Sequence, residues 1–157
     1  MNLRDYIEEV PDFPEKGVSF KDITPLLEDP AAFAYAARAL MDFTESLKID
    51  KVVGIESRGY FFAPLLAFRL GAGFIPARKP GKLPRKTRSQ RYDLEYGNDA
   101  LEIHEASISK GDRVLIHDDV LATGGTARAM CCLLYTSDAA DEYNPGWVSG
   151  GGGGWGG

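Results

Sequence analysis

The chain has 157 residues and a formal net charge of −5, a length that suits one α/β domain with a core and is too short for two ordinary domains. Residues 1–130 hold 18 basic and 20 acidic residues, a balance that argues against bulk nucleic-acid binding. No apolar run is long enough to span a bilayer, and charge begins at Arg4 without a signal peptide. We therefore expect a cytoplasmic protein that binds neither membrane nor nucleic acid.

The first half of the chain predicts a helix, a strand, a second helix and a second strand. Asp29 and Pro30 suit a helix cap and first turn. Apolar residues follow at helical spacing and predict a core-facing stripe of Phe33, Ala36, Ala37, Leu40, Phe43 and Leu47. A strand is expected over 51–55, a helix over about 60–70, and a strand over 73–78.

Residues 92–96 and 100–104 predict the two arms of a hairpin around a Gly97–Asn98 turn. Strands that alternate with helices elsewhere indicate a doubly wound parallel sheet, and so an α/β fold. Between the strand at 73–78 and the hairpin, basic residues gather in a stretch rich in Pro and Gly: Arg78, Lys79, Lys82, Arg85, Lys86, Arg88 and Arg91. This stretch is either a mobile anion-binding loop or an ordinary solvated basic loop.

The segment from Val114 to Ala127, VLIHDDVLATGGTA, carries the strongest chemical signal. A buried strand over 114–116 is expected to end at Asp118 and Asp119, at the sheet edge where open α/β folds keep their ligands. Residues 123–126 then offer hydroxyls and approachable backbone N–H groups, and a helix from Ala127 presents its positive N-terminal end. The segment predicts a site for a phosphorylated sugar. No GxGxxG or P-loop motif is present.

This segment resembles the phosphoribosyl pyrophosphate (PRPP) signature of the type I phosphoribosyltransferases, in the wording DDVLATGGT typical of adenine phosphoribosyltransferases. The resemblance extends over nearly all of residues 10–130. It implies a parallel sheet flanked by helices, with a small N-terminal hood and a flexible hairpin lid. It also implies transfer of the phosphoribosyl group from PRPP to adenine, giving AMP and diphosphate, with Mg²⁺ carried mainly by PRPP and a homodimeric assembly.

The resemblance also implies roles for single residues. In PDFPEKGVSFKDITPLL, Ser19, Phe20 and Lys21 would bind adenine; in GIESRG and ARKPGKLP, Arg58, Arg78, Lys79 and Lys82 would bind diphosphate. In YDLEYG, Glu95 would handle the proton at the base, with Arg58 as a second catalytic residue. In the signature, PRPP and AMP would be bound by Asp118, Asp119, Ala122, Thr123, Gly124, Gly125 and Thr126. His117 is expected to pack or hydrogen-bond within the sheet.

Composition changes after residue 131. Adjacent Cys131 and Cys132 suit neither an ordinary disulfide nor a zinc site, and CLLYTSDAADE resembles a translated sequencing adaptor. We expect an incomplete phosphoribosyltransferase domain over 1–131 that lacks its closing strands, and a foreign or disordered tail over 132–157. Two other functions stay open: transfer to hypoxanthine, guanine or xanthine, and PRPP binding by a regulator without catalysis. No DNA-binding segment is visible, which favours catalysis.

Overall fold

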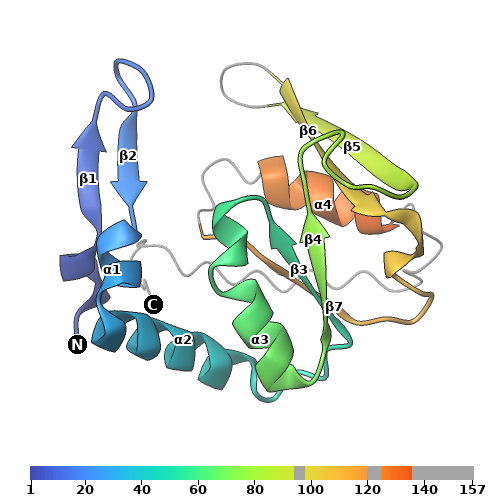
Figure 1. Cartoon of the computed structure of the whole chain (residues 1–157), viewed down its shortest axis with the longest axis horizontal. Coiled ribbons are helices and arrows are strands. Elements are labelled where there is room, and N and C mark those ends of the chain that lie inside the picture. Colours follow the sequence, from blue (N-terminus) through green and yellow to red (C-terminus); the bar gives the residue numbers. More distant parts are fainter. Residues whose placement is uncertain (94–97, 120–124, 136–157) are drawn as a thin grey trace, which may run out of the picture. The chain divides into compact units, whose positions relative to one another are not determined.

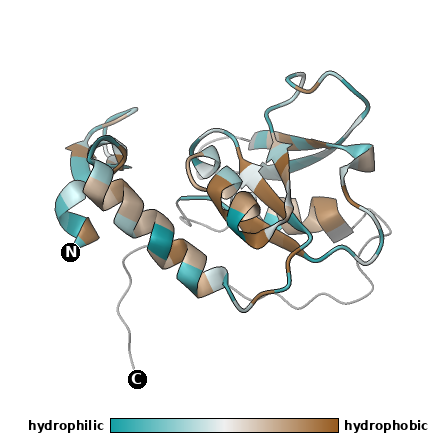
Figure 2. Ribbon diagram, turned by 60° about the horizontal axis from the view of Figure 1, so that its bottom comes forward, coloured by the Kyte–Doolittle hydropathy of each residue, from teal (hydrophilic) through white to brown (hydrophobic). Residues whose placement is uncertain are grey.

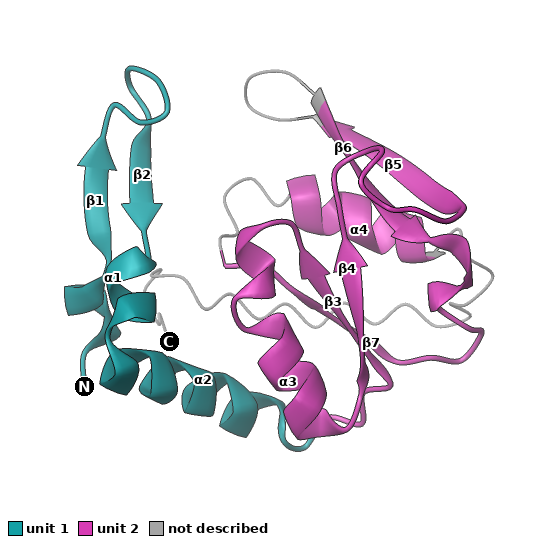
Figure 3. Ribbon diagram, viewed as in Figure 1, with its two compact units in different colours: residues 1–46 teal, residues 47–157 magenta. Residues whose placement is uncertain are grey.

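The structure is a computed structural model that describes residues 1–93, 98–119 and 125–135. The chain divides into two compact units, Met1–Ser46 and Leu47–Gly157 (Figure 3). Within the described residues, no helix has the length and apolar character needed to cross a membrane.

The first unit is a hairpin followed by helices. Its elements are a 3₁₀ turn η1 (Leu3–Tyr6), strands β1 (Glu8–Pro11) and β2 (Ser19–Asp22), and helices α1 (Thr24–Glu28) and α2 (Pro30–Thr44) (Figure 1). The strands pair antiparallel, with Glu9 opposite Lys21. Asp29 caps α2 as predicted, because its carboxylate accepts hydrogen bonds from the backbone N–H groups of Ala31 and Ala32 at 2.9 and 2.8 Å.

The apolar stripe predicted for α2 is only partly right. The buried positions of the helix are Ala32, Ala36, Ala37 and Thr44. Phe43 is 55% exposed, and Leu47, at 40% exposure, follows the end of the helix. The elements that contact α2 within this unit, η1 and α1, approach closely because the buried side chains are small. Thr44 is the buried polar residue of this face, and its hydroxyl donates to the carbonyl of Leu40 at 2.9 Å.

The second unit contains the predicted parallel sheet. Strand β3 (Lys51–Ile55) lies between β4 (Gly73–Ala77) and β7 (Val114–His117) and runs parallel to both (Figure 1). A 3₁₀ turn η2 (Arg58–Tyr60) and helix α3 (Ala63–Leu70) connect β3 to β4, and helix α4 (Gly125–Tyr135) comes after β7. The sheet with flanking helices confirms the predicted fold class. Strand β7 is half-buried rather than buried, because it is the edge of the described sheet.

The core of this unit joins the sheet to the hairpin and to α4, and hydrophobic residues gather where these elements meet (Figure 2). Its buried members are Val53, Ile55, Ile75, Ala77, Leu101, Ile103, Met130 and Leu133. Gly54 allows α3 to pack closely on β3, since a Cβ there would lie 2.9 Å from the Cβ of Ala63 and 2.9 Å from a ring carbon of Phe74.

The predicted hairpin is present in its described part. Its first arm begins earlier than expected, and its second arm begins at Asn98, which was expected in the turn; residues 94–97 lie outside the described residues. Strand β5 (Thr87–Asp93) pairs antiparallel with β6 (Asn98–His104), and a 3₁₀ turn η3 (Glu105–Ser107) follows. Arg88 and Arg91 therefore lie on a strand, and the expectation of a mobile loop was wrong for them. The polar sequence of β5 gave little strand signal; the buried Leu101 and Ile103 of its partner secure the pairing.

Candidate functional site

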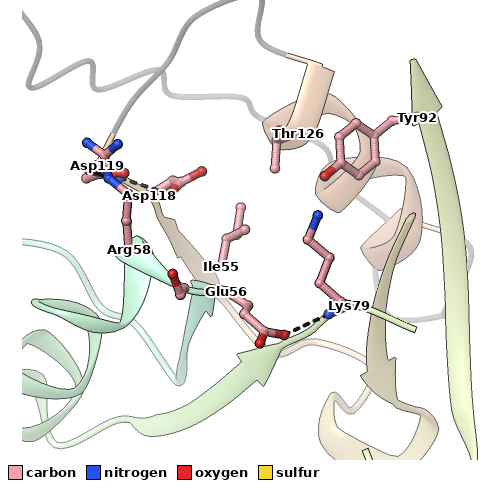
Figure 4. A pocket seen from close by; sticks show the side chains of 9 residues that line it. Ile55, Glu56, Arg58, Lys79, Tyr92, Asp118, Asp119 and Thr126 are labelled. Atoms are coloured by element: carbon pink, nitrogen blue, oxygen red, sulfur yellow. Dashed lines mark hydrogen bonds and ion pairs between the residues drawn. The ribbon is translucent and has the colours of Figure 1, made fainter. Parts of the chain in front are cut away.

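A pocket of about 200 Å³ opens where β3 and β7 end. Parallel strands bring their carboxyl ends to one edge, which is where the sequence predicted the ligand. Figure 4 shows the side chains that line the pocket. They are Ile55, Glu56, Ser57, Arg58, Lys79, Tyr92, Asp118, Asp119 and Thr126.

One wall of the pocket is an ion pair next to a second carboxylate. Arg58 Nε lies 2.5 Å from Asp119 Oδ2, and the Asp119 side chain is only 9% exposed. The Asp119 N–H donates to Asp118 Oδ1 at 3.0 Å. Burial raises the pKa of Asp118 to about 6. This wall therefore holds one carboxylate that is paired and one that ionises close to neutral pH.

Gly59 lets the turn that carries Arg58 lie close to the end of β7. A Cβ at Gly59 would lie 2.7 Å from the carbonyl oxygen of His117, closer than real Cβ contacts. Only glycine lets the turn after β3 approach the end of β7 this closely. His117 itself packs in the sheet as predicted, edge-to-face against Phe62 at 6.2 Å between ring centroids. Its buried Nε2 has no hydrogen-bond partner among the described residues, and burial lowers the pKa of this imidazole.

Glu56 occupies the floor of the pocket and binds the segment that follows β4. Its carboxylate accepts from Arg78 Nε at 3.2 Å and Nη2 at 3.0 Å. It also accepts from the backbone N–H of Lys79 at 2.9 Å (Figure 4). The hydrogen bond from Arg78 lowers the pKa of Glu56, with burial opposing it. Glu56 is thus a charged anchor for two of the residues expected to bind diphosphate.

The opposite wall carries Lys79, whose side chain extends into the pocket beside Tyr92 (Figure 4). The Lys79 ammonium forms an ion pair with Asp99 on β6, which raises the pKa of Lys79. Thr126, in the first turn of α4, lines the pocket above them. A cation, a phenol and a helix N-terminus on one side suit a phosphate group.

The predicted site residues other than Gly125 fall into four groups. Those on the pocket wall are Arg58, Lys79, Asp118, Asp119 and Thr126. Arg78 lies behind the wall, bound to Glu56 and to the carbonyl of Lys82, and Lys82 is exposed outside the lining. Glu95, Ala122, Thr123 and Gly124 lie outside the described residues. Gly125 begins α4, so this helix starts two residues earlier than predicted.

The fourth group, Ser19, Phe20 and Lys21, belongs to the first unit. Glu9 binds two of them, since Ser19 Oγ donates to its Oε1 at 2.5 Å and Lys21 Nζ lies 2.5 Å from its Oε2. Phe20 makes an edge-to-face contact with Phe13 at 5.1 Å. All three are thereby held by contacts inside the first unit.

Sequence reasoning assigned no role to Glu56, Ser57, Tyr92 or Asp99. A signal existed for Glu56 and Ser57, because they directly follow the carboxyl end of β3. Tyr92 and Asp99 are cross-strand partners in the β5–β6 register, which depends on a strand that the sequence indicated only in part. The described residues contain no group of three His, Cys, Asp or Glu side chains placed to hold a metal ion.

A family model described as phosphoribosyl transferase domain matches residues 22–141. The chain belongs to this phosphoribosyl transferase family. Within the family it is 63% identical over 134 residues to the adenine phosphoribosyltransferase of Christiangramia forsetii, covering 85% of this chain and 78% of that protein.

Two solved structures of the same family resemble this chain. The adenine phosphoribosyltransferase of Rhodothermus marinus is 52% identical with a TM-score of 0.81, over 87% of this chain and 77% of that one. The Saccharomyces cerevisiae enzyme, solved with adenine and an imino-altritol bisphosphate, is 40% identical with a TM-score of 0.79, over 87% and 80%.

Proposed function

We propose that this chain transfers the 5-phosphoribosyl group of PRPP to adenine, producing AMP and diphosphate in purine salvage. The observation that carries the proposal is the meeting of Asp118 and Asp119 with Arg58 and Lys79 around one pocket at the strand ends. A phosphorylated sugar with a diphosphate leaving group presents hydroxyls to the carboxylates and anions to the cations. The similar proteins named above, including one solved with adenine, support adenine as the acceptor.

In the proposed reaction, adenine N9 attacks C1 of the ribose and diphosphate leaves with inversion at C1. Asp118 and Asp119 accept hydrogen bonds from the ribose hydroxyls and orient the sugar. Arg58 and Lys79 neutralise the diphosphate as its negative charge grows, with Arg78 behind the wall and the exposed Lys82 as further diphosphate-binding residues. No nucleophilic side chain is required.

The remaining roles complete the proposal. The 5′-phosphate binds the segment Ala122–Thr126 and the N-terminus of α4. Ser19, Phe20 and Lys21 bind adenine, Phe20 by stacking and Ser19 through its backbone. Glu95 handles the proton at the base, and closure of the hairpin excludes water.

The charges of the pocket support a requirement for Mg²⁺. Three carboxylates line its described part, on Glu56, Asp118 and Asp119, against the two cationic side chains of Arg58 and Lys79. A diphosphate group would meet net negative charge there, so a metal bound mainly by PRPP oxygens supplies the missing positive charge. Asp118 and Asp119 offer the hard oxygen atoms that such an ion prefers.

We also propose a homodimer in the cytoplasm. Phe68 on α3 is 88% exposed and offers an apolar side chain that a second subunit would cover. Multi-angle light scattering should give the mass of a dimer. A monomeric mass over the working concentration range would exclude the homodimer.

An assay of PRPP with each purine tests the function. We expect AMP and diphosphate from adenine, and little turnover with hypoxanthine, guanine or xanthine. Turnover with hypoxanthine but not adenine would assign the chain to another purine. Binding of PRPP without turnover of any purine would identify a regulator.

A further inference from the structure

The Lys79 ammonium that lines the pocket is already ion-paired with a carboxylate of the protein. Its backbone N–H is held by Glu56 at 2.9 Å, and its ammonium pairs with Asp99. Of the two paired groups, only Lys79 lines the pocket; Asp99 lies behind it on β6. The cation on this wall is therefore neutralised by the protein's own charge.

The Asp99 carboxylate of this pair is sheltered from solvent, whereas the Lys79 side chain is half exposed. The Asp99 side chain is 21% exposed and the Lys79 side chain 48% exposed. Asp99 Oδ1 also accepts from the backbone N–H of Ala100 at 2.8 Å, which fixes the carboxylate. An anion that binds Lys79 must either displace this carboxylate or stay close to it, and both cost binding free energy.

We propose that Asp99 is a resident counter-ion that opposes the binding of diphosphate to Lys79 and thereby speeds release of this product. The inference rests on the proposed function, since it takes diphosphate as the anion that Lys79 binds. When diphosphate leaves, the Lys79 ammonium returns to Asp99 instead of remaining unpaired. Asp99 is a positioning residue, because it acts through Lys79 and does not touch the reacting atoms.

Asp99→Asn tests the proposal, because asparagine has the same shape, keeps the acceptor for Ala100 and removes the charge. The Kd of inorganic diphosphate with Mg²⁺, measured by calorimetry, should fall by about 3- to 10-fold, within the range of one charge-assisted hydrogen bond. The KM for PRPP and kcat should both fall, since the enzyme would hold diphosphate longer. A merely structural role would weaken binding instead.

Glu102→Gln is the matched control. Glu102 lies on the same strand, and its Oε2 accepts from the backbone N–H of Gly81 at 3.1 Å, a hydrogen bond that glutamine preserves. This variant removes one negative charge that forms no ion pair with a cation of the pocket. Because solvent and salt screen such a charge, the diphosphate Kd should stay within about 2-fold of the wild-type value.

Three results would overturn the proposal: an unchanged or higher Kd in Asp99→Asn, an equal gain in Glu102→Gln, or no diphosphate binding by the wild type. If Asp99→Asn does not fold, Asp99→Ser is judged by the same criteria. Diphosphate binding involves no adenine, so the result is separable from the proposed function. If Asp99→Asn binds diphosphate more tightly but the protein does not turn over adenine, the role proposed for Asp99 stands and adenine is rejected as the acceptor.

Discussion

Arg58 combines a structural and a chemical task. It pairs with Asp119 in the structure and is proposed to bind the leaving diphosphate. Arg58→Ala should raise the transition-state free energy by about 2 to 4 kcal/mol, by analogy with the loss of one oxyanion donor. It should therefore lower kcat/KM by roughly 30- to 1,000-fold. Arg58→Lys keeps the charge and loses the planar guanidinium group, so its kcat/KM should lie between those of the wild type and the alanine variant. Steady-state kinetics checks this, and an unchanged kcat/KM in the alanine variant would exclude the role.

The ionised Asp118 carboxylate should lower the free energy of unfolding. Burial raises its pKa to about 6, above the value near 3.9 of an unfolded aspartate. The native state therefore binds the proton more tightly, so the contribution of Asp118 to stability decreases as pH rises from about 4 to 6, and the loss persists above that range.

Asp118→Asn should consequently raise Tm at pH 7.5 while it lowers activity. Allowing for partial exposure, the gain is about 1 kcal/mol, or roughly 2 to 4 °C. Thermal unfolding at pH 4, 5, 6 and 7.5 should show a difference from wild type that grows with pH. Asp119→Asn is the control and should not stabilise, because it removes the partner of Arg58. A Tm difference independent of pH would contradict the prediction.

At the scale of elements, the turn after β3 depends on the absence of a side chain at Gly59. Gly59→Ala would place a Cβ 2.7 Å from the His117 carbonyl, so the turn or the end of β7 must move. We expect the Arg58–Asp119 geometry to change and kcat/KM to fall by about 100-fold, as for a misplacement of about 1 Å. Steady-state kinetics and a crystal structure of the variant check this.

Gly71→Ala is the comparison for that variant. Gly71 ends α3 with φ +63°, and no atom lies within 4 Å of the position that a Cβ would take there. The substitution should cost stability, since alanine disfavours this backbone conformation, and should leave kcat/KM near wild type. Equal loss of activity in both variants would refute a specific role for Gly59.

Local patterns predicted elements well, and tertiary contacts decided the rest. Strand β3 has the bounds predicted for 51–55, and Asp29 caps α2 as expected. The helix expected over about 60–70 begins at Ala63, because the residues after β3 first form the tight turn η2. Burial of Phe43 was predicted wrongly because helical spacing does not say which neighbours a face meets.

In the site, too, local features could be predicted from the sequence and tertiary contacts could not. Asp118 and Asp119 could be predicted, since a strand and its end are local features. The Arg58–Asp119 pair joins residues 61 positions apart and depends on β3 lying beside β7. Likewise, the link from Glu56 to Arg78 and Lys79 requires β4 beside β3, an order that no local pattern specifies.

At the scale of the whole molecule, the net charge is slightly negative. The chain carries a formal net charge of −5, and carboxylates outnumber cations on the described pocket wall. We expect PRPP to bind at least 10-fold more weakly when Mg²⁺ is removed with EDTA, and activity to return when Mg²⁺ is added. Calorimetry with and without the metal checks this, with Ca²⁺ as a comparison of equal charge. Equal PRPP affinity in EDTA would reject the requirement.

Glu56 has a consequence for which anions the pocket can tell apart. It follows β3 directly, two residues before Arg58, and it grips the backbone of Lys79. Glu56 therefore links the Arg58 side of the pocket to the Lys79 side and limits how far the two sides can separate. An anion that contacts Arg58 and Lys79 at the same time gains from both cations, so the pocket should prefer two linked phosphates to a single one.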